Sequence, residues 1–292
     1  MMNMQGVEEL KQFISYGGEL NICILDNNTI DFLIKIKEII SADKIFGRYN
    51  LILIPGWVEE EINDSEYRKE YVCELSERYK LNKFHIKEQN YCELVNGLEG
   101  DLFNLFKYSV YTSAEITRFI NRNIIRGNPI EDLEPYEEWL QKLYNEGLAG
   151  KRLSNGRIKR KNAGEISICV LAYILAYYYF DNIENAIIFT HDNDCYDYVT
   201  LAGEKLIKDD KFKRKNRKPI TFKSNDVLLY EFINNKLIDE SEIENILNNV
   251  RQERYLRFNR KKSDNSIENQ HKLVNNEEFY EIIKDQSSQI IF

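Results

Sequence analysis

The chain has 292 residues, of which 43% are hydrophobic and 30% are charged, and its formal net charge is −8. This composition is ordinary for a globular protein that buries a large core, and no apolar run reaches the roughly 18 residues that span a bilayer. Its five cysteines are scattered without a CxxC pair, which argues against a disulfide framework and against a zinc site.

Strand and helix signals alternate from the first residues. Residues 8–16 predict a short helix, which Gly17-Gly18 ends. Residues 20–25 (LNICIL) predict a buried strand, and residues 29–40 have the apolar spacing of a helix. The opening segment MMNMQGVEELKQF lacks the charged and then apolar order of a signal peptide, so we expect a cytoplasmic protein without a membrane anchor.

The same alternation continues along the chain. In order, we predict a strand at 51–54 (LILI), a helix beginning WVEEEI after Pro55-Gly56, a weaker strand at 83–87, a helix at 165–179, strands at 186–190 (AIIFT) and 219–223, and a helix at 225–234. Residues 97–162 are helical and irregular, which is typical of an insertion. The charged, Asn-rich residues 236–292 predict a helical extension with a loosely ordered linker near 261–270.

Strands that alternate with helices predict an α/β protein. We expect a three-layer α/β/α fold with a mostly parallel sheet of about five strands, covered by helices on both faces. The domain organisation follows: an N-terminal helix over 1–19, the α/β domain over 20–235 with its helical insertion at about 97–162, and the extension over 236–292. In such sheets ligands bind beyond the carboxyl ends of the strands, where strand order reverses.

Several acids are predicted to meet at that edge. Asp26 directly follows one buried strand, and Asp192 comes two residues after another. Glu59, Glu60 and Glu61 open the helix after the second strand. Glu165 opens the long apolar helix, and Asp194 follows Asp192 in the turn THDND. Grouped carboxylates resist joint ionisation, and Mg²⁺ or Mn²⁺ relieves their repulsion while supplying phosphodiester chemistry.

Each acid also has a structural interpretation. Asp26 and Asp192 could cap helices or close turns, and the glutamates after the second strand could complement a helix dipole. Glu165 lies three residues after Asn162, the spacing of a capping box. Both interpretations remain open for every position, and the joint placement of the acids favours a site.

Four segments resemble the acidic motifs of PIN-domain nucleases, in the order of that family: ICILDNNTIDFL, LILIPGWVEEEI, NAGEISICVLA and AIIFTHDNDCYDYV. The resemblance covers roughly residues 20–235 and implies a metal-dependent ribonuclease that cleaves single-stranded RNA. It implies catalytic roles for Asp26, Glu61, Glu165, Asp192 and Asp194, with the first four as Mg²⁺ or Mn²⁺ ligands. The register Val-x-x-Glu selects Glu61 over its two acidic neighbours. The long gap between the second and third motifs, and the chain beyond the last strand, depart from the family and leave the substrate open.

Basic residues are clustered despite the acidic total. Residues 208–218 and 251–262 form two basic clusters. A third cluster immediately precedes the helix of Glu165 and is our candidate for contact with a nucleic-acid backbone: Lys151, Arg152, Arg157, Lys159, Arg160 and Lys161. The alternative interpretation is a solvated loop.

The function expected from these features is that of an endonuclease, with RNA as the first substrate and a toxin or defence role suggested by the family. The partners that it implies are nucleic acid and a protein inhibitor, and the chain could also assemble with itself. Three alternatives remain: a DNA-directed nuclease, a catalytically silent PIN-like scaffold that binds RNA or a protein, and a flavodoxin-like receiver with Lys223 after its last strand. The absence of GxGxxG and GxxxxGK[ST] after any strand excludes the usual nucleotide-binding motifs.

Overall fold

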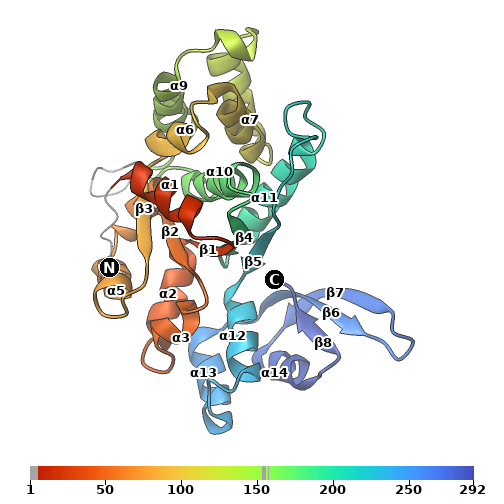
Figure 1. Cartoon of the computed structure of the whole chain (residues 1–292). Coiled ribbons are helices and arrows are strands. Elements are labelled where there is room, and N and C mark those ends of the chain that lie inside the picture. Colours follow the sequence, from red (N-terminus) through yellow and green to blue (C-terminus); the bar gives the residue numbers. More distant parts are fainter. Residues whose placement is uncertain (1–5, 153–155, 157) are drawn as a thin grey trace.

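A computed structural model describes residues 6–152, 156 and 158–292 (Figure 1). The strands are β1 (Leu20–Leu25), β2 (Leu51–Pro55), β3 (Lys83–Ile86), β4 (Ile183–Phe189), β5 (Ile220–Lys223), β6 (Arg254–Lys261), β7 (Ile267–Val274) and β8 (Ser288–Ile290). The first seven α-helices are α1 (Val7–Tyr16), α2 (Asn27–Ile36), α3 (Ala42–Phe46), α4 (Gly56–Ile62), α5 (Glu66–Glu77), α6 (Tyr91–Leu94) and α7 (Glu99–Ser109). The remaining α-helices are α8 (Ala114–Phe119), α9 (Tyr136–Lys142), α10 (Ala163–Tyr178), α11 (Asn193–Leu206), α12 (Asn225–Asn234), α13 (Ile243–Val250) and α14 (Asn276–Lys284). Five short elements complete the set: the 3-10 turns η1 (Glu88–Asn90), η3 (Ile130–Asp132) and η5 (Glu240–Glu242), and the π-helical turns η2 (Ile120–Ile125) and η4 (Leu143–Gly147).

The central sheet has five parallel strands in the order β3-β2-β1-β4-β5, which confirms the predicted α/β fold. β1 pairs with β2 on one side and with β4 on the other, so strand order reverses between β1 and β4. The LNICIL and LILI segments are buried on both faces, as apolar strands of a covered parallel sheet should be. The reversal places the ends of β1 and β4 side by side.

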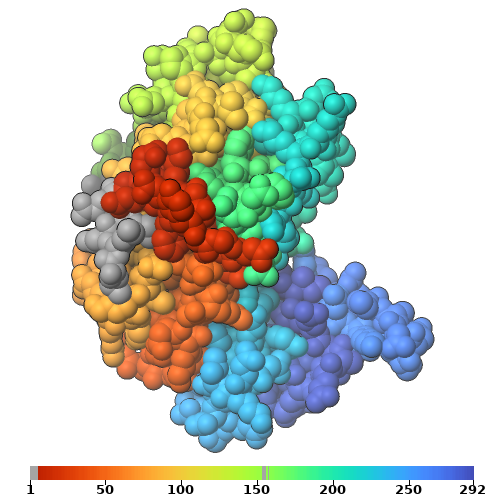
Figure 2. All heavy atoms as spheres, in the orientation of Figure 1, coloured from red at the N-terminus to blue at the C-terminus, as the bar shows by residue number. Residues whose placement is uncertain are grey.

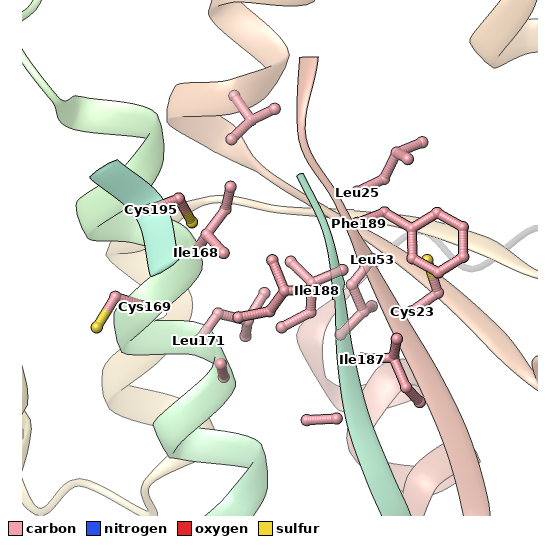
Figure 3. Close-up of a cluster of buried hydrophobic side chains, with 14 of the residues drawn as sticks. Cys23, Leu25, Leu53, Ile168, Cys169, Leu171, Ile187, Ile188, Phe189 and Cys195 are labelled. Atoms are coloured by element: carbon pink, nitrogen blue, oxygen red, sulfur yellow. The ribbon is translucent and has the colours of Figure 1, made fainter. Parts of the chain in front are cut away.

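Helices cover both faces of this sheet. Figure 3 shows Ile168 and Leu171 of α10 turned toward Ile188 of β4, whereas Cys23 and Phe189 lie on the other side of the strands. The Phe189 ring packs on Phe46 of α3, with ring centroids 5.6 Å apart. The layers are therefore α10 with α11 on one face, and α2, α3 and α5 on the other. Among the described residues, no helix is long and apolar enough to cross a membrane.

The insertion is helical, and its helix α7 packs against both α10 and α11. It forms one end of the molecule, while residues 236–292 form a lobe at the opposite end, which we call the C-terminal module (Figure 2). Asp26 caps α2, which begins at Asn27, so this helix starts earlier than its apolar spacing suggested. It ends at Ile36, four residues before the predicted end.

The prediction of a purely helical C-terminal extension was wrong. The module contains α13 and α14 together with a three-stranded antiparallel sheet in the order β7-β6-β8. Residues 261–270, expected as a loose linker, belong to the β6–β7 hairpin. β6 buries Leu256 and Phe258 on one face, whereas β7 is mostly polar and exposed. The polar sequence of β7 did not predict a strand, because pairing with β6, rather than burial of its own side chains, stabilises it.

Candidate functional site

The strand ends at the reversal point are joined by a chain of hydrogen bonds. Asp26, only 5% exposed, accepts one bond from the backbone N–H of Asn27 and another from the Thr190 hydroxyl, each 2.7 Å long. The Thr190 oxygen in turn accepts from the Asp192 backbone N–H at 3.1 Å. These contacts fix Asp26 and the Asp192 turn relative to each other.

Helix α4 directs its three glutamates to three different partners. Glu59 pairs with His85 at 2.9 Å, and Glu60 accepts from the Tyr144 hydroxyl. Glu61 accepts from the side-chain amide of Asn27, the residue that follows Asp26. The register chosen from the sequence therefore places Glu61, and neither of its neighbours, beside Asp26.

Glu165 lies in the first turn of α10 but does not complete a capping box. Asn162 occupies the capping position with a left-handed backbone, φ 56°, and makes no side-chain cap. Its amide instead donates to the Tyr198 hydroxyl. The reciprocal capping box is therefore absent; the Glu165 carboxylate accepts from its own backbone N–H and lies near Asp26 and Asp192.

Asp192 and Asp194 lie in the turn between β4 and α11. Asp192 caps α11 by accepting from the Asp194 backbone N–H at 2.8 Å, so the structural interpretation holds for this aspartate as it does for Asp26. Asp194 is exposed and lines a second groove on the side of the C-terminal module. We call Asp26, Glu61, Glu165 and Asp192 the carboxylate cluster.

Three cluster members, Asp26, Glu61 and Glu165, have a raised pKa. Burial is the largest cause of the pKa of about 7 at Asp26; the Thr190 hydrogen bond opposes it, and the charges of Glu61 and Asp192 add to it. The pKa of Glu61 is raised to about 7 by burial and then by Glu165. Burial and then Asp26 raise the pKa of Glu165 to about 7. Carboxylates that repel one another in this way favour a cation among them.

The cluster opens into a cavity of about 700 Å³, which we call the site cavity. Its lining includes Glu61, Glu165 and Asp192, whereas Asp26 is buried and does not line it. Its lining also includes four of the basic residues expected to contact nucleic acid: Lys151, Lys159, Arg160 and Lys161. Arg152 is exposed on the same loop and does not line the cavity, and Arg157 lies outside the described residues.

Several residues of the site carry no functional signal in the sequence. Asn27 directly follows Asp26, and its side-chain amide donates to Glu61. Arg68 of α5 lines the cavity, pairs with Asp31 through two bonds of 2.7 and 2.6 Å, and donates to the Glu61 carbonyl at 3.3 Å. Trp57 and Tyr144 form an aromatic wall. The aromatic residues could only have been found from tertiary structure, because they come from separate elements.

The donor set fits a hard divalent cation. Within residues 6–152, 156 and 158–292, no three histidine, cysteine, aspartate or glutamate side chains already form a metal-binding group. Mg²⁺ usually keeps several waters and binds through one or two carboxylates, so it does not need such a complete cage. The all-oxygen cluster suits Mg²⁺ or Mn²⁺ better than zinc, which prefers nitrogen and sulfur ligands.

Comparisons with family models, with curated proteins and with solved structures gave no match to this chain. The class that fold and geometry define is an α/β protein with a carboxylate cluster at the point where its parallel sheet reverses strand order.

Proposed function

We propose that this chain is a divalent-metal-dependent endonuclease that hydrolyses phosphodiester bonds in single-stranded nucleic acid, with RNA as the first substrate. The observation that carries the proposal is the cluster itself: Glu61, Glu165 and Asp192 line the same cavity as lysine and arginine side chains, and Asp26 is buried next to them. Carboxylates suit a divalent metal ion, and lysine and arginine side chains suit a phosphate backbone.

The residues divide into two groups by role. Asp26, Glu61, Glu165 and Asp192 would hold Mg²⁺ or Mn²⁺, with Thr190 and Asn27 orienting two of them. A cation bound there supplies the activation of water and the charge stabilisation that phosphodiester hydrolysis requires. Asp194, exposed beside Asp192, contributes negative charge near the site.

The basic residues of the cavity lining have a separate task. Lys151, Lys159 and Lys161 line the cavity and would contact the phosphate backbone without regard to base sequence. Their charge also offsets the repulsion between the acids and a polyanionic substrate; Lys159, for example, lowers the pKa of Glu61 against the effect of burial. Binding through them should weaken as salt concentration rises.

The test is cleavage of labelled single-stranded RNA, single-stranded DNA and duplex DNA with Mg²⁺, Mn²⁺ or EDTA. We expect cleavage that needs the metal and falls at least about 100-fold in Asp26→Asn. The matched control is Asp181→Asn, an exposed aspartate before β4, which should cleave like the wild type. Isothermal titration of Mn²⁺ should show weaker binding to Asp26→Asn than to the control.

Other outcomes would select other functions. Cleavage confined to DNA would identify a DNA-directed nuclease. Nucleic-acid binding without cleavage under any metal condition would favour a silent scaffold. Equal cleavage by the wild type and Asp26→Asn would reject the site.

A further inference from the structure

Three side chains form a stacked column along one wall of the site cavity. Trp57 of α4 is 4% exposed and stacks on Tyr144 of η4, with ring centroids 5.1 Å apart and an interplanar angle of 26°. The Arg160 guanidinium lies over the Tyr144 ring, 4.4 Å from its centroid. The column thus runs from a buried indole to a partly exposed guanidinium, and all three residues line the cavity.

The orientation of Arg160 is fixed from two directions. Its two terminal nitrogens donate to Asn145, one to the backbone carbonyl and one to the side-chain oxygen, each at 3.1 Å. Tyr144, which supports one side of the guanidinium, is itself held by its hydroxyl bond to Glu60. The guanidinium is therefore a planar group in which each terminal nitrogen donates one N–H to Asn145.

This arrangement suits stacking better than phosphate binding. An arginine can bind phosphate through the edge between its two terminal nitrogens, and here that edge donates one N–H from each nitrogen to Asn145. A supported guanidinium plane is instead a surface on which nucleobases stack. Bases within a duplex already have neighbours on both faces, so such a surface favours an unpaired base.

We infer that the Trp57–Tyr144–Arg160 column is a stacking platform that holds an unpaired base of a single-stranded nucleic acid beside the carboxylate cluster. The inference rests on the proposed function in taking nucleic acid as the ligand of this cavity. It gives Arg160 a different role from its lysine neighbours, which contact the backbone, and it supplies a physical basis for selecting single strands over duplexes.

The test uses short single-stranded RNA and DNA oligonucleotides that carry 2-aminopurine at each position in turn, bound in EDTA so that metal-dependent cleavage is silent. Stacking quenches 2-aminopurine fluorescence, so binding to the wild type should quench one position more than the others. Arg160→Lys keeps the charge but removes the plane. We expect it to lose that quench and to bind roughly tenfold more weakly.

Two controls separate stacking from charge and from folding. Arg260→Lys makes the same exchange at a half-exposed arginine of β6, which pairs with Asp285, and this variant should quench like the wild type. An abasic residue at the quenched position should weaken binding to the wild type but not to Arg160→Lys. The same sequence as a duplex should bind the wild type more weakly than the single strand.

Failure of this inference can be told from failure of the nuclease proposal. No position-specific quench in the wild type, or the same quench in Arg160→Lys, would overturn the platform even if Mn²⁺-dependent cleavage is observed. A quench that depends on Arg160 without any cleavage would retain the platform and reject the nuclease.

Discussion

Without a metal ion, the acids of the carboxylate cluster lower the folding stability of the protein at neutral pH. Asp26, Glu61 and Glu165 have folded pKa values of about 7, whereas unfolded aspartate and glutamate titrate near pH 4. Between these limits the folded chain keeps protons that the unfolded chain releases, so stability from these groups is fully present below about pH 4 and is lost as pH rises through 7. A cation would restore it by binding the ionised form.

This linkage predicts a pH-dependent effect of Glu165→Gln. At pH 8 in EDTA, the amide removes a repelled charge, so the variant should be more stable than the wild type by about 1–2 kcal/mol. At pH 4 the two should be equal, because Glu165 is then protonated in the folded chain. Thermal unfolding between pH 4 and 8 would measure this, with exposed Glu240→Gln as the control.

The same experiment with Mn²⁺ should reverse the order at pH 8, since the wild type gains more from the cation. Parallel stability curves for the wild type and Glu165→Gln across this pH range would contradict the repulsive cluster.

Two helices bring Glu61 and Glu165 together, and one buried carboxylate joins their first turns. Glu88, 1% exposed, accepts from the Trp57 backbone N–H of α4 at 2.9 Å and from the Ser167 hydroxyl of α10 at 2.5 Å. Gly56 permits the approach, because a Cβ there would lie 2.7 Å from a Glu88 oxygen. Burial is the largest cause of the pKa of about 7 at Glu88.

The two bonds to Glu88 share one oxygen, which makes two substitutions informative. Glu88→Gln keeps an oxygen acceptor and should retain nearly wild-type stability at pH 7. Glu88→Ala leaves the Trp57 N–H unpaired and opens a cavity, so it should lose roughly 3 kcal/mol. Urea denaturation followed by circular dichroism would measure both, and equal losses would exclude the shared acceptor as the reason.

Across the whole molecule, the C-terminal module is tied to the sheet domain by buried charge. Arg251 binds Asp226 of α12 at 2.8 Å, and the two side chains are 2% and 1% exposed. Arg251 also donates to the Val274 carbonyl at 3.0 Å. Arg254 donates to the ring of His191, the residue before Asp192. The module therefore reaches the turn that carries one member of the carboxylate cluster.

We expect Arg251→Ala to destabilise the chain by roughly 3–5 kcal/mol, because Asp226 would remain buried without its closest partner. Arg260→Ala, which removes a more exposed pair with Asp285, should cost less than about 1 kcal/mol. Guanidinium-induced unfolding of both variants would give the comparison. Similar small losses would show that the module is only loosely coupled to the sheet domain.

The sequence by itself determined the α/β fold and the position of Asp26 and Asp192 at the edge of the sheet. Runs such as LNICIL and LILI are apolar throughout, and only strands covered on both faces bury such runs, so the parallel sheet and the edge position of Asp26 and Asp192 followed from local pattern. The resemblance to a Val-x-x-Glu motif selected Glu61, and the structure pairs Glu59 and Glu60 with other partners. A polar strand such as β7 leaves no such pattern, so the C-terminal sheet was missed.

Only the tertiary structure decided what depends on contacts between distant segments. Asn162 has a left-handed backbone and makes no side-chain cap, so it does not form a capping box with Glu165. The sequence did not signal this conformation. The partnership of Asn27 with Glu61, and the column of Trp57, Tyr144 and Arg160, join residues from separate elements. Their side chains meet because the sheet and its helices fix the spacing between elements. The local sequence does not predict that spacing.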